Sequence, residues 1–465
     1  MPNPDQILAA VQMRAAEEAL VAAGTSVDEL MQRAGRGAAE WVWRIAGARA
    51  VTVLCGPGNN GGDGYVIAEA IRERGGDVMV IAAAPPKTAA ARHARLLWQG
   101  ETLDAAASRH GDVLVDCLYG SGLTRPLGAQ DTALLCRLAA RHHKLVAIDL
   151  PSGTDCDRGA LFGERLPGAD VTLALGAWKF AHWLMPASVR MGELRLVEIG
   201  VGNVTGAARL LARPQIDPPT ADAHKYRRGL LAVVGGTMPG ASLLACMAAQ
   251  RSGAGYVKLL AEAAVMAPAD LVVELGALTA QLADKRIAAL LVGPGLGRSQ
   301  TSHSRLRAAL ACDVPAVIDA DALMLIGPGD VAGRRAPIIA TPHEGELVQL
   351  ERAFGCAAGG SKVARAVALA QASAMIIVAK GPDTVIAAPG GAVVVAPPAP
   401  SWLSVAGTGD VLAGTIASRL ATGLEPIEAA GQGLWLHGEA ARLAGPAFTA
   451  QTLAEALPRA IEAAL

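Results

Sequence analysis

Four consecutive residues in the last quarter of the chain have the types that phosphoryl transfer requires: Gly407, Thr408, Gly409 and Asp410. Small residues leave backbone N–H groups free to surround an anionic oxygen, and a helix that begins there adds a favourable dipole. An aspartate at the rim of such an anion site can take a proton from a hydroxyl group as phosphoryl transfer begins. The pattern therefore predicts phosphoryl transfer to or from a small molecule.

A second glycine-rich segment, residues 56–64, lies far upstream and reads GPGNNGGDG. It fits the G-x-G-x-x-G pattern of dinucleotide-dependent oxidoreductases, which is a weak signal alone. The acidic residue expected at the end of the next strand is missing, because residues 80–84 are Val-Ile-Ala-Ala-Ala. An ordinary oxidoreductase is therefore disfavoured.

The unusual residues of this segment are Asn59, Asn60 and Asp63, whose side-chain oxygens suit a hard cation. Asparagine also tolerates left-handed turns, so a purely structural role stays open. Two further aspartates follow strand-like runs: Asp116 precedes residues 120–126, and Asp149 precedes a Pro-Ser-Gly turn.

Ligands of open α/β sheets bind at the carboxyl ends of the strands. We therefore expect Asn60, Asp116 and Ser152 to be able to converge on one cation, and Asp149 to face a ligand. A single aspartate at a strand end could simply cap the next helix. Three aligned strand ends favour a binding site.

The elements that must position these residues follow from composition and apolar patterning. The chain has 465 residues, which predicts two domains, and its 52% hydrophobic, 3% aromatic composition suits α/β cores of small aliphatic side chains. Residues 1–45 and about 65–74 are predicted helices. Predicted strands of the first half are residues 50–55, 78–82, 113–117, 145–149 and 171–175.

A proline-dense polar stretch interrupts this pattern at residues 213–220. We predict one domain over residues 1–213, a linker over about 213–221 and a second domain over residues 222–465. Predicted strands of the second domain are residues 230–234, 289–292, 316–318, 338–340, 375–379 and 385–387; helices are expected near 242–252, after Asp410 and over most of 427–464. Both domains are predicted to be α/β.

The first glycine-rich turn of the second domain, residues 235–242, nearly fits a P-loop. Ala241 stands where the phosphate-binding lysine would be, which excludes a Walker-type NTPase. Other strands are followed by Gly295, by Asp319 and Asp321, and by His343. His343 has a structural and a functional interpretation, and its place at a strand end keeps the functional one open.

Charge and cysteine usage limit the partners. Lys and Arg number 41 against 42 Asp and Glu, which argues against a broad nucleic-acid surface. Seven scattered cysteines fit reduced thiols rather than a disulfide framework. We expect a cytoplasmic protein without a signal peptide or membrane segment, and a homo-oligomer.

Residues 1–205 resemble the NAD(P)H-hydrate epimerase domain of the YjeF N-terminal type, a Rossmann-like three-layer α/β/α fold. The resemblance rests on residues 29–35, 58–64, 116–122 and 149–153, with mild departures at Tyr119 and Ser121. It implies potassium at Asn60, Asp116 and Ser152. It implies that the hydrated nucleotide is held by Asn59, Asn60, Gly61, Gly62, Asp63, Gly120, Ser121, Gly122, Leu123, Thr124, Arg125, Pro126 and Asp149.

Residues 224–423 resemble the ADP-dependent NAD(P)H-hydrate dehydratases, which have a ribokinase-like α/β fold. The substrate contacts implied are Ala241, Gly295, His343 and Asp410. The residues implied to hold ADP, which would come with Mg²⁺, are Lys380, Gly381, Pro382, Asp383, Thr384, Gly407, Thr408 and Gly409. Glu344 departs from a common proline without changing these assignments.

Together the two resemblances imply a bifunctional enzyme, an isomerase and a lyase, that repairs hydrated NADH and NADPH. Asp410 is then the catalytic base of dehydration, and Asp149 the candidate acid or base of epimerisation. The alternatives are a true kinase of a vitamin precursor or sugar, and a chain in which one half only binds or senses ligand. The preferences between NADH and NADPH hydrates and between ADP and ATP have no signature in the sequence.

Overall fold

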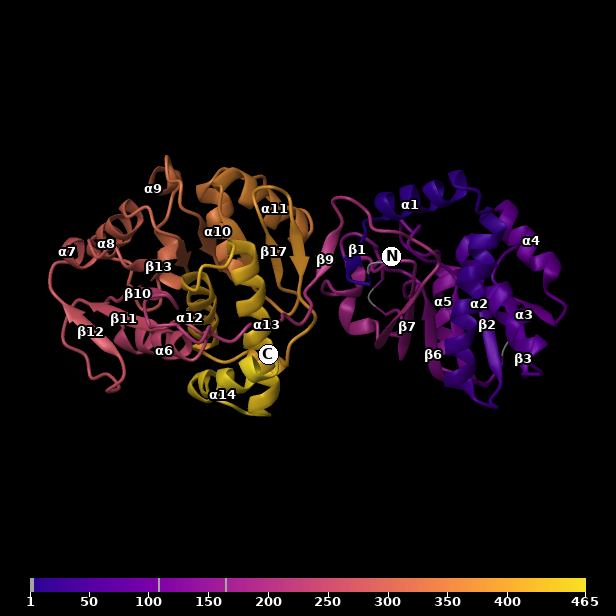
Figure 1. The fold of residues 1–465 in the computed structure, drawn as a ribbon. Coiled ribbons are helices and arrows are strands. Elements are labelled where there is room, and N and C mark those ends of the chain that lie inside the picture. Colours follow the sequence, from indigo (N-terminus) through magenta and orange to yellow (C-terminus); the bar gives the residue numbers. More distant parts are fainter. Residues whose placement is uncertain (1–3, 108, 164) are drawn as a thin grey trace. The chain divides into compact units, whose positions relative to one another are not determined.

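The computed structural model describes residues 4–107, 109–163 and 165–465. The chain divides into two compact units, Met1–Arg209 and Leu210–Leu465, and both are α/β as predicted. Figure 1 draws the first unit from indigo to magenta and the second from magenta to yellow. No helix within the described residues is long and apolar enough to cross a membrane.

The first unit contains a seven-stranded sheet in which every neighbouring pair is parallel, in the order β4-β3-β2-β5-β6-β7-β8. The chain starts at β2, builds outward to β4, then returns to the other side of β2 to add β5, so the strand order reverses between β2 and β5. The strands are β2 Val51–Cys55, β3 Val78–Ala82, β4 Thr102–Asp104, β5 Gly111–Cys117, β6 His142–Ile148, β7 Val171–Leu175 and β8 Glu193–Val197, with the short pair β1 Gln6–Ile7 and β9 Ala208–Leu210. The helices are α1 Ala10–Ala22, α2 Val27–Ala46, α3 Asn59–Glu73, α4 Ala89–Leu97 and α5 Ala129–Ala139, with 3₁₀ turns at Phe180–His182 and Ser188–Arg190.

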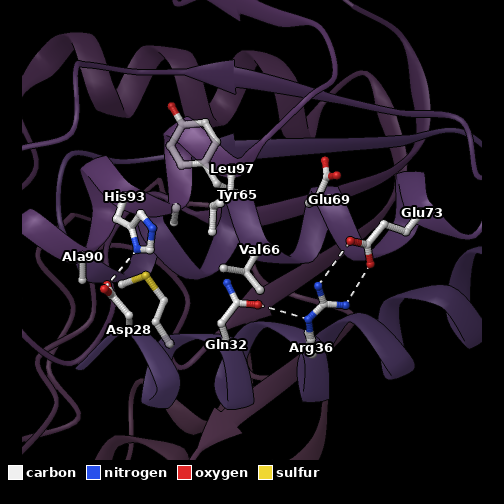
Figure 2. A pocket seen from close by; sticks show the side chains of 12 residues that line it. Asp28, Gln32, Arg36, Tyr65, Val66, Glu69, Glu73, Ala90, His93 and Leu97 are labelled. Atoms are coloured by element: carbon white, nitrogen blue, oxygen red, sulfur yellow. Dashed lines mark hydrogen bonds and ion pairs between the residues drawn. The ribbon is translucent and has the colours of Figure 1, made fainter. Parts of the chain in front are cut away.

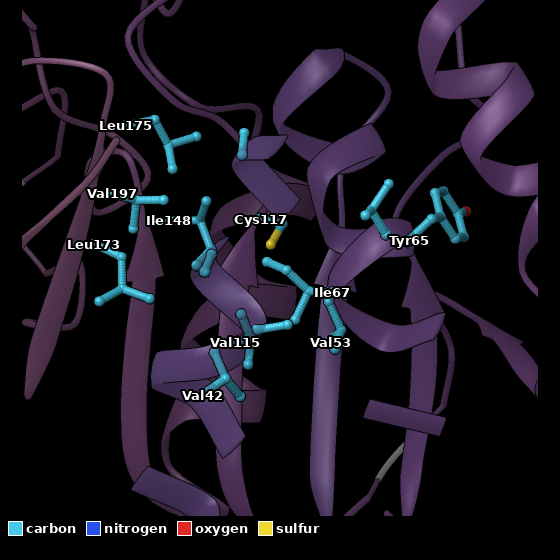
Figure 3. Close-up of a cluster of buried hydrophobic side chains, with 14 of the residues drawn as sticks. Val42, Val53, Tyr65, Ile67, Val115, Cys117, Ile148, Leu173, Leu175 and Val197 are labelled. Atoms are coloured by element: carbon cyan, nitrogen blue, oxygen red, sulfur yellow. The ribbon is translucent and has the colours of Figure 1, made fainter. Parts of the chain in front are cut away.

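Both faces of this sheet are covered, which explains why its strands are continuous apolar runs. In β2, Val53 packs into a core with α2 and α3, whereas the next residue, Leu54, packs into a second core with α5. Figure 3 shows the first core, where Val53, Val115 and Ile148 lie among side chains such as Ile67. The helices are thereby fixed against the strands whose ends carry the predicted site residues.

The second unit has the same order reversal, between β10 and β13, in the sheet order β18-β17-β16-β15-β14-β13-β10-β11-β12. Strands β10 to β16 pair in parallel, and β17 and β18 are antiparallel. The strands are β10 Leu230–Val234, β11 Tyr256–Ala261, β12 Val272–Leu275, β13 Ile287–Val292, β14 Ala316–Ile318, β15 Ile338–Ala340, β16 Ile376–Ala379, β17 Val385–Ala387 and β18 Val393–Val395. The helices are α6 Pro239–Gln250, α7 Leu278–Gln281, α8 Gln300–Ala311, α9 Pro328–Val331, α10 Glu344–Ala353, α11 Lys362–Ser373, α12 Thr408–Ala421, α13 Pro426–Ala444 and α14 Ala450–Glu462, with 3₁₀ turns at Ala320–Met324 and Ser401–Leu403.

Several predicted elements differ from the structure. The helix expected from about residue 65 begins at Asn59, so most of the supposed glycine loop is its first turn. Strand β6 ends at Ile148, and Asp149 already has a left-handed backbone with φ of 67°. The helical prediction for residues 1–45 omitted β1, and its residues 1–3 lie outside the described residues. Strands β4, β8, β9, β11, β12 and β18 were not predicted.

A glycine substitution tests the packing of α12 against α6. A Cβ at Gly414 would overlap the backbone oxygen of Ala245, so we expect Gly414→Ala to lower the free energy of unfolding by roughly 1–3 kcal/mol. A Cβ at Gly329 in α9 would meet nothing within 4 Å, so Gly329→Ala is the matched control and should cost nothing. Urea unfolding measures the stability of both variants. If the two variants had the same unfolding midpoint, close packing of Gly414 against Ala245 would not be what stabilises this region.

Candidate active sites

The start of α3 brings the amide and acidic side chains of the first glycine segment to the point where the strand order reverses. A Cβ at Gly61 would overlap the oxygen of Gly56, and one at Gly64 would lie 2.7 Å from the sulfur of Cys55. Only glycine therefore lets α3 lie this close to β2. Asn60 and Asp63 stand three residues apart, on the same side of the helix. The N-cap residue of α3 is Gly58, and within the described residues no side-chain cap is present, so the first N–H groups of the helix can face a ligand.

Asp116 and Ser152, both predicted to bind a cation, are in direct contact. The Ser152 hydroxyl donates to Asp116 Oδ1 at 2.7 Å, and its backbone N–H donates to Oδ2 at 2.9 Å. The amide oxygen and nitrogen of Asn60 are both buried without a hydrogen-bond partner in the described part of the chain. A Cβ at Gly120 would lie 3.2 Å from Asn60 Cγ and 3.1 Å from Asp149 Oδ2. Asn60, Gly120 and Asp149 are thus gathered at one place.

Asp149 forms a buried ion pair with Lys179, a residue that the sequence analysis missed. Lys179 Nζ lies 2.5 Å from Asp149 Oδ1 and donates to the oxygen of Leu175 at 2.6 Å. The N–H of Ser121 donates to Asp149 Oδ2 at 2.9 Å, and His182 Nε2 donates to the backbone oxygen of Asp149. A lysine within the apolar run Ala-Trp-Lys-Phe-Ala just after β7 was the signal that could have identified it.

Two carboxyl groups in this site have opposite protonation preferences. Burial would raise the pKa of Asp149, but the charge and hydrogen bond of Lys179 outweigh it and lower that pKa to about 2. Burial, with the charges of Asp149 and Glu17, raises the pKa of Asp63 well above its usual value. Asp149 is therefore ionised at neutral pH, whereas the environment of Asp63 shifts that carboxyl toward its neutral form. Such a pair suits acid–base chemistry.

The remaining predicted residues of this unit lie on two adjoining segments. Asn59, Gly61 and Gly62 belong to the first turn of α3, where Asn59 is exposed and the two glycines are buried. Gly122, Leu123, Thr124, Arg125 and Pro126 form the partly exposed loop between β5 and α5. These two segments follow β2 and β5, the strands on either side of the order reversal.

In the second unit, the predicted anion site is the N-terminus of α12. Gly407 precedes the helix with φ of 90°, and no side chain caps the free N–H groups of the first turn. The Thr408 hydroxyl instead donates to the oxygens of Leu403 and Val405, which fixes the preceding loop. The N–H groups of this first turn are available for an anionic oxygen.

Lys380 and Asp410 bring charge to that anion site. Lys380 Nζ is 2.7 Å from Asp319 Oδ1 and would be 3.4 Å from a Cβ at Gly409. Burial, reinforced by the neighbouring charge of Asp319, raises the pKa of Asp410 to about 7. Asp410 can therefore exchange a proton near neutral pH. Asp319 follows a predicted strand but had no role assigned from the sequence, and Glu346, whose Oε2 lies 4.0 Å from Lys380 Nζ, was not singled out there.

The glycine turns after β10 and β13 are packed backbone to backbone. The N–H of Met238 donates to the oxygen of Gly295 at 3.0 Å, and a Cβ at Gly295 would be 3.3 Å from that of Ala241. Two predicted substrate contacts, Ala241 and Gly295, are thereby neighbours. The Ser242 hydroxyl also donates to the oxygen of Pro294.

His343 caps α10 while its side chain remains largely exposed. Its Nδ1 accepts hydrogen bonds from the N–H groups of Gly345 and Glu346, and its Nε2 lies 3.3 Å from Glu346 Oε1. The structural role of His343 is thus real, and its exposure leaves it able to touch a ligand as well.

The segment after β16 forms a tight turn. The Thr384 hydroxyl donates to the oxygen of Gly381, and Asp383 Oδ1 pairs with Lys362 at 2.5 Å. Gly381 and Pro382 are exposed in that turn. The turn follows Lys380, whose ammonium group lies beside Gly409, so it begins next to the anion site.

The first unit also contains a cavity of about 220 Å³ whose lining includes none of the residues predicted to bind ligand. Figure 2 shows its lining from α2, α3 and α4, with Asp28 paired to His93 and Arg36 to Glu73. The residues drawn include none of the predicted site residues, so this cavity is not the candidate site.

Fold and site together define a two-domain α/β enzyme with a nucleotide-type anion site. A family model described as NAD(P)H-hydrate dehydratase matches residues 231–463, and one described as YjeF-related protein N-terminus matches residues 27–181. The chain belongs to the family of bifunctional NAD(P)H-hydrate repair enzymes.

The relatives that show this cover almost the whole chain. The bifunctional NAD(P)H-hydrate repair enzyme Nnr of Mycobacterium tuberculosis H37Rv is 35% identical over 440 residues, 90% of this chain and 89% of its own. That of Salinibacter ruber is 34% identical over 503 residues, 92% and 91% of the two chains. A solved structure of ADP/ATP-dependent NAD(P)H-hydrate dehydratase from Bacillus subtilis is 26% identical, covers 54% of this chain and 95% of its own, and has a TM-score of 0.47.

The buried pair of Lys179 and Asp149 leads to a stability prediction. Lys179→Met leaves a buried carboxylate unpaired, which should lower the free energy of unfolding by roughly 3–5 kcal/mol at pH 7. The paired Asp149 has a lowered pKa in the folded protein, so its stabilisation is present above about pH 4 and is lost as the pH falls toward 2. The deficit of the variant should therefore shrink in acid.

Lys144→Met is the matched control, because Lys144 forms an exposed pair with Asp170 at 3.3 Å and should contribute less than about 1 kcal/mol. Urea unfolding at pH 7 and in mild acid measures both variants. Equal losses for the two lysines, or a deficit that grows in acid, would contradict the importance of the buried pair.

Proposed function

We propose that this chain repairs hydrated NADH and NADPH, whose nicotinamide ring carries added water. The first unit interconverts the R and S epimers of the hydrate. The second unit dehydrates the S epimer with ADP, releasing AMP and phosphate. The observation that carries the proposal is the uncapped start of α12, where Asp410 and Lys380 meet in a chain of this family.

The dehydration follows from the chemistry of that site. Asp410 removes the proton of the substrate hydroxyl while the hydroxyl oxygen attacks the terminal phosphorus of ADP, and AMP leaves. The free N–H groups at the start of α12 and the ammonium group of Lys380 stabilise the charge on the transferring phosphoryl group. The bond between the ring carbon and the phosphate oxygen then breaks, the adjacent ring carbon loses a proton, and the electrons of its C–H bond restore the double bond. A phosphate ester is a far better leaving group than hydroxide, which explains the use of ADP.

The ligands of the second unit divide between two regions of the sheet edge. Residues 380–384 and 407–409 hold ADP. Ala241, Gly295, His343 and Asp410 contact the hydrate. The described residues contain no group of three or more His, Cys, Asp or Glu side chains placed to hold a metal, so Mg²⁺ would come with the phosphates of the nucleotide and neutralise their charge.

In the first unit, residues 59–63 and 120–126 and Asp149 bind the hydrate. Potassium would be held by Asn60, Asp116 and Ser152 and would supply a fixed positive charge there. The residues fit such an ion, because the buried amide oxygen of Asn60 has no hydrogen-bond partner among the described residues and Asp116 is a buried carboxylate. Asp149 is the proposed proton-transfer group of epimerisation, and its ionised form suits a proton acceptor. A cytoplasmic location and a homo-oligomeric state stay predictions.

Asp410 is tested by substitution and by pH. With S-hydrate and ADP, Asp410→Asn should slow the recovery of reduced-nicotinamide absorbance by roughly 10²–10⁴-fold, because the base is lost. In the unsubstituted protein, kcat/KM should rise with pH up to about 7 and then level off, as Asp410 loses its proton.

Asp270→Asn, an isosteric change at an exposed residue, is the control and should leave the rate unchanged. Unimpaired dehydration by Asp410→Asn would remove Asp410 from the mechanism. A stable phosphorylated product without recovery of absorbance would favour the kinase alternative.

Asp149 is tested with mixed epimers. Given R and S hydrates and ADP, Asp149→Asn should recover the absorbance of the S form at the normal rate and then stop, since epimerisation is lost. The dehydratase reaction in the same sample serves as the internal control. Complete recovery of both epimers at the normal rate would eliminate Asp149 as the acid or base.

A further inference from the structure

A cavity of about 350 Å³ lies at the carboxyl ends of β10 and β11, beside the residues assigned to the hydrate. This volume is in the range of small-molecule sites. Its lining comes from the turn that joins β10 to α6 and from the segment after β11: Gly235, Gly236, Thr237, Pro239, Ser242, Leu259, Ala261, Glu262, Ala263, Ala264 and Val265. Ala241 lies between two of these residues in the chain, so the cavity continues the proposed substrate site.

The order of the strands shows which part of a ligand reaches this cavity. Along the sheet edge, Lys380 follows β16, Asp319 follows β14 and Gly295 follows β13, and the cavity comes next, over β10 and β11. The proposed ADP therefore occupies one side of the reacting centre, and the cavity lies on the other. A dinucleotide whose nicotinamide ring is at the reacting centre must extend its second half away from ADP. The cavity is the space on that side.

Glu262 gives the cavity a specific chemistry. It directly follows β11, which pairs in parallel with β10, and β10 is followed by Gly235 and Gly236 and then by α6. In dinucleotide-binding folds, an acid after the second strand of such a unit accepts a hydrogen bond from the ribose 2′-hydroxyl. Glu262 is exposed and makes no ion pair or hydrogen bond with the described residues, so its carboxylate is free to do this.

We propose that this cavity binds the adenosine half of the hydrated dinucleotide, with Glu262 on the ribose hydroxyls, and that the dehydratase therefore prefers the hydrate of NADH to that of NADPH. The proposal rests on the proposed function. A 2′-phosphate would bring further negative charge against the Glu262 carboxylate.

One cationic group whose charge interacts with that of Glu262 is Arg305 of α8. Its guanidinium donates to the oxygens of Gly235 and Leu260, both at 3.0 Å, so it is held by backbone carbonyls below the turn. Arg305 offsets part of the Glu262 charge. If it could instead reach a 2′-phosphate, the preference would be reversed, which the experiment detects.

The first experiment compares kcat/KM for S-NADH hydrate and S-NADPH hydrate with saturating ADP. The unsubstituted enzyme should favour the NADH hydrate, and Glu262→Gln should reduce the ratio roughly fivefold, mainly by improving KM for the NADPH hydrate. Glu455→Gln, which removes an equal charge from an exposed position of α14, should leave the ratio unchanged. A preference for the NADPH hydrate, or an unchanged ratio in Glu262→Gln, would overturn the proposal while leaving the dehydratase activity established.

A second variant tests occupancy of the cavity. Ala264 is exposed and lines the cavity, so Ala264→Trp should fill it without disturbing the core. KM for the NADH hydrate should rise about tenfold, and KM for ADP should stay the same. A rise in KM for ADP instead would place the adenosine of ADP in the cavity and overturn the proposal. No turnover of either hydrate by the unsubstituted protein would refute the proposed function itself, and this proposal with it.

Discussion

The reversal of strand order in each parallel sheet is the constraint on which both sites depend. Where the order reverses, the segments that follow the two central strands leave in opposite directions and open a crevice at the sheet edge. In the first unit, α3 begins beside this crevice, and in the second unit the turns after β10 and β13 flank it. Polar side chains elsewhere in these sheets would be buried between strands and helices, so the crevice is the place where polar side chains can contact a ligand.

Both units contain a similar arrangement of charged groups, although their sequence motifs are unrelated. Each has a lysine paired with a buried aspartate at a strand end: the fully buried Lys179 with Asp149, and the partly buried Lys380 with Asp319. Each also has an aspartate near the start of a helix, Asp63 in α3 and Asp410 in α12, and the pKa of each is raised. The ion pair fixes one charge in place, and burial leaves the other carboxyl able to carry a proton.

Much of this arrangement could be predicted from the sequence because strand ends were visible as apolar runs that stop at a glycine or aspartate. β3, β7 and β10 have the predicted bounds, and Asp116 and Ser152, which follow two neighbouring strands, are in contact. The start of α3 could not be predicted, because Asn and Gly disfavour helix and only close packing against β2 compensates. Lys179 was missed because its partner is 30 residues away and its neighbours suggested core.

The position of Asp410 on the most deeply enclosed helix of the second unit has an evolutionary consequence. Every residue of α12 from Val411 to Ala421 is buried, and the helix packs against α6 and α13. Repacking that core would shift the helix start, and with it the proton acceptor and the anion site. Stability and reactivity therefore share one set of residues, and sequence change in this unit is freest at the periphery, such as the exposed face of α14.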